Sequence, residues 1–364
     1  MIINCPLSAS LEVEPLIKAG AREFYCGLLP PRLSSKTIDF ELINRRPDYG
    51  ANFSSLDELY KAKKIADKYN AKLAITLNEF YPQPQLDQIV PLLRDIRQIG
   101  ITEIIVADIG LLKYVTDFNQ DLEITISIMA SVFNPQAVSL LRKICPRIKK
   151  IMLPCHLSFD AIRNIVNQNP GIEFETFIFN EICHYEVGLC NYTHNPYRKN
   201  YFVSIIKRSP LLDRACQAVF QDNLPTFFQN KFFEYAHIYP CHVRRNDLCL
   251  VTKDPFIKPK KNDVLSVFLK NLKPEKMIFG CGVCFLPQLT AADIKYVKIG
   301  GRNNSLKKKI RNLSFVVACL KKAEQLGFRD RDDVSTEWQK LFSKFFRCHQ
   351  SDCVSCKNFC CFSS

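Results

Sequence analysis

The sequence contains no hydrophobic run long enough to cross a membrane. Its longest apolar stretch, ITEIIVADIGLL, is interrupted by Glu103 and Asp108 and falls short of the roughly 18 to 20 residues that a spanning helix requires. The amino-terminal residues also lack a basic segment that leads into an apolar core and a small-residue cleavage site, the pattern of a secretory signal peptide. We therefore expect a cytoplasmic protein without a membrane span.

Several catalytic motifs are missing as well. The chain has no H-E-x-x-H zinc motif, no G-x-S-x-G nucleophile elbow and no P-loop, and GCGVCF at residues 280–285 has Phe285 where a dinucleotide fingerprint needs its third glycine. Cys155 and His156 are adjacent, and adjacent side chains on a strand point apart, so they do not predict a nucleophile and its base. The sequence thus gives a hydrolase little mechanistic support.

Cysteine, in contrast, is abundant, with 17 residues in a chain of 364. In a reducing compartment this abundance favours metal or redox work over disulfides. Four cysteines stand singly in apolar segments, where a thiol behaves as a small core residue; they are Cys5, Cys26, Cys145 and Cys319.

The charge is unevenly distributed along the chain. Residues 1–150 hold 19 Lys and Arg against 17 Asp and Glu, so +12 of the net charge of +14 falls on residues 151–364. We expect any anionic partner, such as nucleic acid, a phosphorylated small molecule or an acidic protein, to meet this second half. A solvated basic face is the alternative interpretation.

Strand-like runs alternate with amphipathic helical stretches in the first half of the chain, and we interpret the runs as apolar on both faces, as in a parallel sheet covered by helices. Ser55, followed three residues later by Glu58, predicts a capping box at one helix start. The regular alternation predicts an α/β fold, a (β/α) TIM-like barrel. The expected strands span residues 1–5, 22–27, 72–77, 103–108, 123–128, 149–154, 172–179, 275–280 and 294–301, with helices near 11–19, 55–70, 85–98, 109–116, 135–144, 158–167 and 305–327.

Four regions follow from this pattern. Residues 1–183 predict the first part of the barrel, and 184–275, with scattered prolines and aromatic clusters, predict an irregular insertion over its rim. Residues 276–325 supply the last barrel units, and 326–364 a helix and a Cys-rich tail.

Several of the remaining cysteines follow predicted strands. Cys183 and Cys190 are spaced too widely for a zinc knuckle, but they come just after a strand, where barrels place their chemistry. Cys216, Cys241 and the pair Cys281 and Cys284 follow downstream. Thiolates that converge from such loops suit an iron–sulfur cluster or a structural zinc.

The sequence resembles the collagenase-like peptidase U32 family through an ordered set of blocks. These are GAREFYCG at 20–27, ANFSSLDEL at 51–59, ITLNEFY at 75–81, IIVADIGLL at 104–112, the Cys183 and Cys190 pair, and VKIGGR at 297–302. The family includes proteins of oxygen-independent hydroxylation, of the ubiquinone ring or of RNA bases, that carry a [4Fe–4S] cluster. The resemblance implies Cys183, Cys190 and Cys216 as three ligands and favours Cys281 as the fourth, with Cys284 and Cys241 as competitors.

Departures from the family pattern fall on polar positions near the expected site. Ile128 and Met129 replace a Thr-Gln pair, Cys155 and His156 replace an Arg-Glu pair, and Gly300 replaces a glutamate. They predict a divergent member with a different substrate.

The tail offers a second candidate metal site, because Cys348, Cys353 and Cys356 have the C-x4-C-x2-C spacing of plant-type ferredoxins. His349 makes zinc an alternative there. A terminal segment without a metal is the other interpretation.

Polar residues at the ends of predicted strands complete the candidate site. Glu79 and Asp108 are candidate catalytic or substrate-orienting groups, although Asp at a strand end is also an ordinary helix cap. Arg302, with Gly300 and Gly301, predicts an anion-binding turn before a helix, and Lys307, Lys308 and Lys309 strengthen that expectation. A tight turn that requires glycine is the alternative.

Together these observations predict an iron–sulfur protein of oxygen-independent hydroxylation or a related modification, acting on a small molecule or RNA with a protein partner that supplies electrons or substrate. A U32 peptidase or metal-dependent hydrolase is the second hypothesis. A non-enzymatic RNA-binding or scaffold protein is the third.

Overall fold

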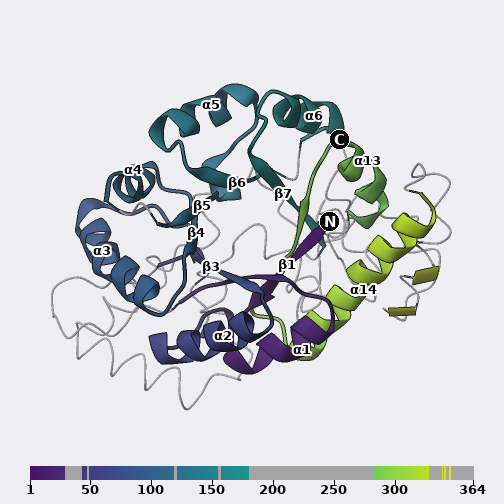
Figure 1. Ribbon diagram of the computed structural model, residues 1–364, viewed down its shortest axis with the longest axis horizontal. Helices are drawn as coiled ribbons and strands as arrows, with labels where there is room; N and C mark the ends of the chain where they lie inside the picture. The colour runs from purple at the N-terminus through teal and green to yellow at the C-terminus, as the bar shows by residue number, and fades with distance from the viewer. Residues whose placement is uncertain are drawn as a thin grey trace, which may run out of the picture. The chain divides into compact units, whose positions relative to one another are not determined.

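The described residues form a closed (β/α) barrel. The computed structural model describes residues 1–28, 43–46, 49–118, 121–154, 157–179 and 282–327, together with residues 338, 340, 341, 344 and 345. Within these residues, eight parallel strands follow one another around the barrel in sequence order, and the last strand pairs with the first. Helices surround the strands (Figure 1). The predicted TIM-like α/β fold is confirmed.

The strands lie where the sequence predicts them, with small differences at their ends. The predicted strands at 103–108 and 123–128 both end two residues early. Asp108 turns to cap the next helix, and Ser127 caps a short 3-10 turn. The strands are β1 (Ile2–Leu7), β2 (Glu23–Cys26), β3 (Lys72–Leu77), β4 (Glu103–Val106), β5 (Glu123–Ile126), β6 (Ile148–Met152), β7 (Glu173–Phe179) and β8 (Tyr296–Ile299).

Strand β7 pairs directly with its neighbour β8 in the closed barrel. The strand predicted at residues 275–280 and the insertion predicted at 184–275 lie outside the described residues. The described residues end at Phe179 and begin again at Gly282. The backbone N–H of Gly282 donates to the carbonyl oxygen of Ile178 at 2.7 Å. The chain therefore leaves and re-enters the barrel at the same point, the carboxyl end of β7.

The helices also follow the predicted positions. Ser55 caps α2 by accepting the backbone N–H of Glu58 at 3.3 Å, but the Glu58 carboxylate bonds to Ser10 and Lys61, so only half of the predicted capping box is seen. The helical elements are η1 (Ser10–Glu12), α1 (Val13–Lys18), η2 (Tyr49–Ala51), α2 (Leu56–Lys68), α3 (Gln83–Gln98), α4 (Ile109–Phe118), η3 (Ile128–Ala130), α5 (Pro135–Ile144), α6 (Phe159–Asn167), η5 (Val283–Phe285), α13 (Leu286–Ala291) and α14 (Leu306–Gln325).

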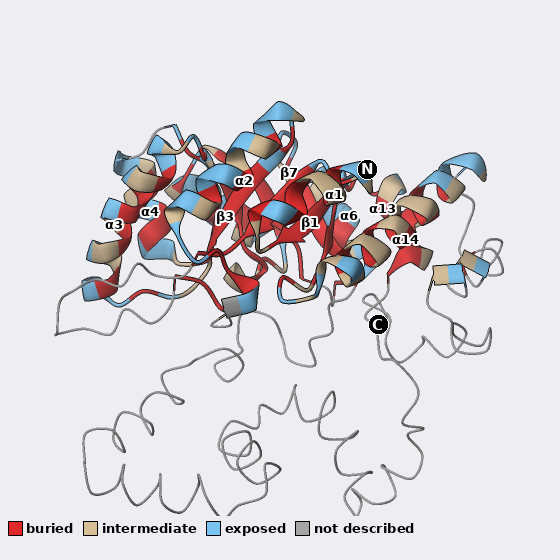
Figure 2. Cartoon of the chain, turned by 90° about the horizontal axis from the view of Figure 1, so that it is seen from below, coloured by how far each residue is buried: buried red, intermediate tan, exposed pale blue. Residues whose placement is uncertain are grey.

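The main hydrophobic core lies between the outer face of the strands and the helices, and the strands are almost wholly buried (Figure 2). The four cysteines predicted as core residues are all free and buried there, which confirms that prediction: Cys5, Cys26, Cys145 and Cys319. Inside the barrel, Tyr25, Ala74 and Ile105 form a separate cluster, so the barrel is filled by side chains. Among the described residues, no helix has the length and apolar character to span a membrane.

Candidate functional site

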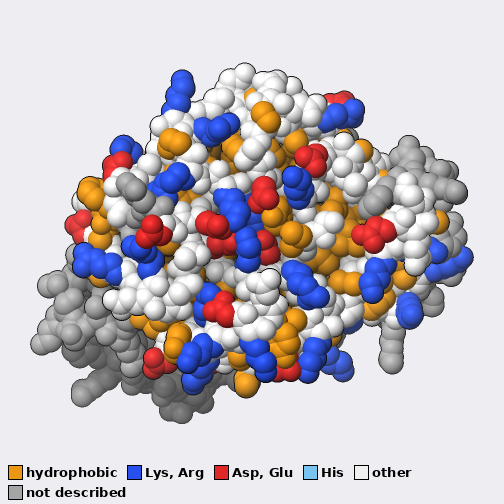
Figure 3. Space-filling model, in the orientation of Figure 1, with side chains coloured by type: hydrophobic (Ala, Val, Ile, Leu, Met, Phe, Trp, Pro, Cys, Tyr) orange, Lys and Arg blue, Asp and Glu red, His pale blue; other side chains and the backbone are white. Residues whose placement is uncertain are grey.

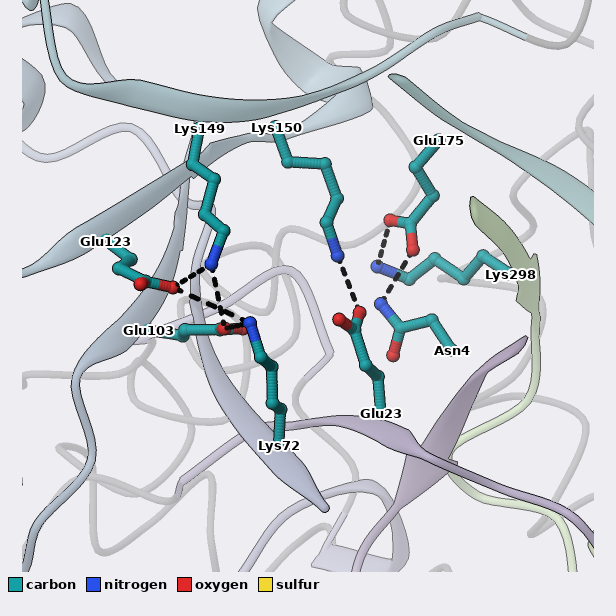
Figure 4. A network of polar contacts seen from close by, with 9 residues as sticks. All are labelled: Asn4, Glu23, Lys72, Glu103, Glu123, Lys149, Lys150, Glu175 and Lys298. Carbon is teal, nitrogen blue, oxygen red and sulfur yellow. Dashed lines mark hydrogen bonds and ion pairs between the residues drawn. The ribbon is translucent and has the colours of Figure 1, made fainter. Parts of the chain in front are cut away.

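The amino-terminal end of the barrel carries a network of charged side chains. Glu23, Lys72, Glu103 and Glu123 are the first residues of β2 to β5. Lys72, Glu103 and Glu123 point toward one another and toward Lys149 of the neighbouring β6, and Glu23 points toward Lys150 (Figure 4). Lys72 Nζ lies 3.2 Å from Glu103 Oε1, and Lys149 pairs with Glu123. Basic and acidic side chains are accordingly visible in the middle of the molecule in Figure 3.

The network continues into the barrel interior through two buried ion pairs. Lys150 Nζ lies 2.6 Å from Glu23 Oε2, and Lys298 Nζ lies 3.4 Å from Glu175 Oε2. Asn4 Nδ2 donates to the other Glu175 oxygen at 2.7 Å. These side chains are on the inner face of strands that the sequence analysis interprets as apolar on both faces. That interpretation is wrong for the inner face. Charged side chains can be buried there because their pairing offsets the free-energy cost of removing them from water.

The pKa values of Glu175 and Lys298 reflect the balance between burial and pairing. Burial raises the pKa of the Glu175 carboxyl, but the ammonium groups of Lys298 and Lys150 outweigh it, so the pKa lies below its ordinary value. Burial lowers the pKa of Lys298, and Glu175 offsets only part of that effect. Since the amino-terminal end of such barrels serves stability, we interpret the network as structural.

The opposite, carboxyl end of the barrel holds a buried polar cluster around Arg302. Arg302 follows β8, and its guanidinium donates to Thr76 Oγ1 at 2.9 Å and to Asn44 Oδ1 at 2.7 Å. Asn44 Nδ2 donates in turn to Asn52 Oδ1 at 2.9 Å. The cluster ties the ends of β8 and β3 to the segment between β2 and α2. Arg302, predicted from sequence as an anion-binding residue, therefore lies at the expected face, engaged by neutral oxygens.

Gly27 makes this cluster possible. A Cβ atom at position 27 would lie 2.0 Å from Asn52 Oδ1, 2.1 Å from Arg302 Nη1 and 2.7 Å from Asn44 Nδ2. These three side chains pack directly on the backbone after β2, which only glycine allows.

Glu79, a predicted catalytic residue, lies at the same face and is held by Arg45. Arg45 Nη1 lies 2.9 Å from Glu79 Oε1, and both side chains are largely buried. The backbone N–H of Arg45 donates to Asn78 Oδ1 at 3.3 Å. Because Arg45 directly follows Asn44, the position of Glu79 is linked through the backbone to the Arg302 cluster.

Asp108 adopts the helix-cap geometry that the sequence analysis gives as its alternative. Its Oδ1 accepts the backbone N–H of Leu111 at 2.7 Å at the start of α4, and its Oδ2 accepts the N–H of Tyr81 at 3.4 Å. The carboxylate thus joins the loops after β3 and β4. Its predicted catalytic role stays a prediction.

The turn after β8 has the conformation that glycine favours. Gly301 has a positive φ of 99°, and Gly300 donates its backbone N–H to Phe179 of β7 at 2.9 Å. Lys309 does not add charge to this turn, because its ammonium is buried against Glu12 at 2.7 and 2.9 Å. The expectation that Lys309 supports anion binding is therefore corrected, since it ties α14 to the start of α1.

Among the described residues, an apolar cluster lies at the carboxyl ends of β5 to β7. Ile128, Met152 and Phe177, from the ends of β5 to β7, form a buried cluster against which Met129 packs. Ile128 and Met129 occupy positions where the sequence departs from its family's polar pattern. The described part of the rim therefore carries a hydrogen-bonded cluster at β8, β2 and β3 and an apolar cluster at β5 to β7.

The predicted cluster ligands Cys183, Cys190, Cys216 and Cys281 lie outside the described residues, as do Cys241, Cys348, Cys353 and Cys356. Within the described part of the chain, no three His, Cys, Asp or Glu side chains are grouped as metal ligands. Cys284 is described, and it packs partly buried against the main hydrophobic core. Burial raises the pKa of the Cys319 thiol on α14, and the Cys284 thiol adds to that effect. The fourth ligand stays a prediction.

Sequence reasoning missed most of the polar cluster. Asn52 and Thr76 lie within blocks that carry the family resemblance, and their presence there was the available signal. Asn44 and Arg45 lie in a segment without a recognisable pattern. Their roles depend on the close approach of three loops at the barrel rim.

A closed barrel with its polar cluster at the carboxyl end is the architecture of a TIM-barrel protein. Residues 10–201 match the family described as peptidase family U32. This match covers more than half of the chain, and the chain belongs to that family.

Three known proteins show similarity to parts of this chain. A stretch of 151 residues is 26% identical to the 23S rRNA 5-hydroxycytidine C2501 synthase of Escherichia coli (strain K12) and covers 41% of this chain but 22% of that protein. The chain therefore matches less than a quarter of this relative's length. The structure of the U32 peptidase Mk0906 has a TM-score of 0.41 at 10% identity, covering 83% of this chain and 94% of that one. The dihydrodipicolinate synthase of Aquifex aeolicus has a TM-score of 0.34 at 14% identity, covering 49% and 62%.

Proposed function

We propose that this protein acts in the oxygen-independent hydroxylation, or a related modification, of an RNA base, with a protein partner that supplies electrons or substrate. The observation that carries the proposal is the 26% identity to an rRNA hydroxycytidine synthase within a family whose barrel this chain shares. The +12 charge on residues 151–364 suits a polyanionic substrate. The departures at Ile128 and Met129 favour a target nucleotide different from that of the relative.

The two clusters at the rim support a flat heterocyclic substrate. Bases are recognised by stacking on apolar or aromatic groups and by hydrogen bonds to their edges. The apolar cluster of Ile128, Met152 and Phe177 suits a ring face. The groups of Asn44 and Arg302 are hydrogen-bonded to each other and, for Arg302, to Thr76, and some of these bonds would be exchanged for bonds to the polar edges of the base.

We further propose that Cys183, Cys190, Cys216 and Cys281 hold a [4Fe–4S] cluster, with zinc as the alternative. Cys183 is four residues beyond Phe179, so it lies within about 14 Å of the end of β7. Cys281 adjoins Gly282, which is hydrogen-bonded to Ile178. Covalent reach thus allows these two thiols to approach one another at the candidate rim. When bound, the cluster would supply electron transfer.

The test begins with protein purified without oxygen. We expect a brown protein with about four iron and four sulfide per chain, and loss of both in Cys183→Ser and Cys281→Ser. The matched control is Cys284→Ser, which should keep the cluster because Cys284 packs against the hydrophobic core. A colourless protein that retains one zinc through purification would contradict the cluster assignment.

The RNA assignment is tested separately. Nucleosides from the RNA of cells with and without the gene are compared by mass spectrometry, and one hydroxylated or otherwise modified base should disappear with the gene and return with the wild-type copy. An unchanged nucleoside profile would contradict it.

The second hypothesis, a peptidase, rests on the description of the family. It predicts cleavage of a peptide substrate that is lost on chelation and retained in Cys183→Ser. A non-enzymatic RNA binder would bind RNA with a steep salt dependence but leave the nucleoside profile unchanged.

A further inference from the structure

Phe80 is an exposed aromatic side chain at the carboxyl end of the barrel. It lies between β3 and α3, and 44% of it is exposed to solvent. The other exposed aromatic side chains among the described residues are Tyr60 on α2 and Phe118 at the far end of α4. Phe80 is thus the one of the three that lies in a loop at the carboxyl ends of the strands.

The residues on both sides of Phe80 are firmly held. Glu79 accepts the backbone N–H of Phe80 at 3.0 Å and pairs with Arg45 at 2.9 Å. Tyr81 is buried, and its hydroxyl donates to the carbonyl oxygen of Ile43 at 2.5 Å. An exposed ring on a fixed backbone loses little conformational entropy when a ligand stacks on it.

A cation lies over the Phe80 ring. The guanidinium carbon of Arg45 is 5.9 Å from the ring centroid, within the range of a cation–π contact. Aromatic rings and arginine planes are the groups on which proteins stack single-stranded bases. The Phe80 ring and the Arg45 guanidinium therefore provide a stacking surface beside the polar cluster. The fold itself does not require a hydrophobic side chain to face water at this position.

We propose that Phe80, backed by Arg45, is a stacking platform for an unpaired base of the RNA substrate, adjacent to the base that enters the rim. This inference rests on the proposed RNA function. The platform would hold the single strand while the target base approaches the cluster of Arg302 and Asn44. It recognises the face of a base, so it tolerates different bases at that position.

The first experiment measures the affinity of the full-length protein for a short single-stranded RNA at several salt concentrations. We expect Phe80→Ala to weaken binding about 5- to 100-fold, the effect of losing one stacked base. The slope of log affinity against log salt should not change, because Phe80 contacts no phosphate. Phe118→Ala is the matched control, because Phe118 is 69% exposed but lies at the end of α4 that is far from the carboxyl end of the barrel. The affinity of this variant for RNA should equal that of the wild type.

The second experiment observes stacking directly. The chain has one tryptophan, Trp338, which is buried, so Phe80→Trp introduces an exposed indole. We expect RNA to quench its fluorescence and to leave the fluorescence of Phe118→Trp unchanged. Equal melting temperatures of all variants exclude a folding defect.

The outcomes separate the two proposals. If the wild type binds and modifies RNA but Phe80→Ala binds equally well, the platform is overturned and the proposed function stands. If the wild type neither binds nor modifies RNA, both fail. Weaker binding by Phe80→Ala together with quenching in Phe80→Trp supports the platform.

Discussion

The buried pair of Lys298 and Glu175 allows a quantitative prediction. Lys298→Met removes the ammonium and leaves the Glu175 carboxylate, which is fully buried, with Asn4 as its hydrogen-bond donor at 2.7 Å. Removing one partner of a buried ion pair costs about 3–5 kcal/mol, because the other charge stays in a poorly solvating interior. We expect a loss of free energy of unfolding of that size.

The double variant Lys298→Met, Glu175→Gln distinguishes a lost pair from a general packing defect. Both replacements are neutral and close to the original side chains in shape, so the double variant should recover to within about 1–2 kcal/mol of the wild type. Urea unfolding of the full chain, followed by far-ultraviolet circular dichroism, measures both variants and the wild type. A double variant as unstable as Lys298→Met would refute the reasoning.

The same double variant tests where the function lies. The pair is beneath the rim, on the side of the barrel that we interpret as structural. RNA modification by the folded double variant should therefore equal that of the wild type, and its loss would place the network in the active site.

Three further predictions follow from the geometry. Gly27→Ala should destabilise the protein by about 1–3 kcal/mol and weaken RNA modification, because the new Cβ overlaps Asn52 and Arg302; an unchanged melting temperature and activity would speak against the cluster. Burial raises the pKa of the Cys26 thiol to about 12, so iodoacetamide at pH 8 should label it only after unfolding, and mass spectrometry of the native protein checks this. The pKa of Glu175 is lowered in the fold, so its stabilisation is complete above the ordinary carboxyl pKa of about 4.5 and is lost as the pH falls through its folded value. Glu175→Gln should flatten the acid side of the stability curve, and an unaltered acid limb would disprove this assignment.

The order of strands and helices could be predicted from the sequence because local chemistry determines it. Strand-like runs of four to seven residues, as in β3 and β7, alternate with helices that follow Ser55 and Ser305, whose side chains cap them. The barrel followed from the count of such units. The four core cysteines were also predictable, since each stands in an apolar segment.

The inner face of the barrel could not be predicted in this way. Glu23, Lys150, Glu175 and Lys298 are polar residues within strands, and their partners are up to 171 residues away in the sequence, as for Asn4 and Glu175. Periodicity reports which face a residue is on, but it does not report which charges meet across a closed barrel. The Arg302 cluster shows the same limit, because Asn44 comes from the loop between β2 and α2 and Thr76 from strand β3.

The hydrogen bond between Gly282 and Ile178 also bears on how this chain could diversify. Residues 180–281 begin and end at neighbouring backbone positions, so the strands on either side meet whatever the length of the intervening polypeptide. Closing a loop costs free energy that grows only logarithmically with its length, about 0.6 kcal/mol for each doubling. Evolution, or an engineer, could therefore shorten, lengthen or exchange that segment and alter specificity while the scaffold that carries the chemistry stays intact.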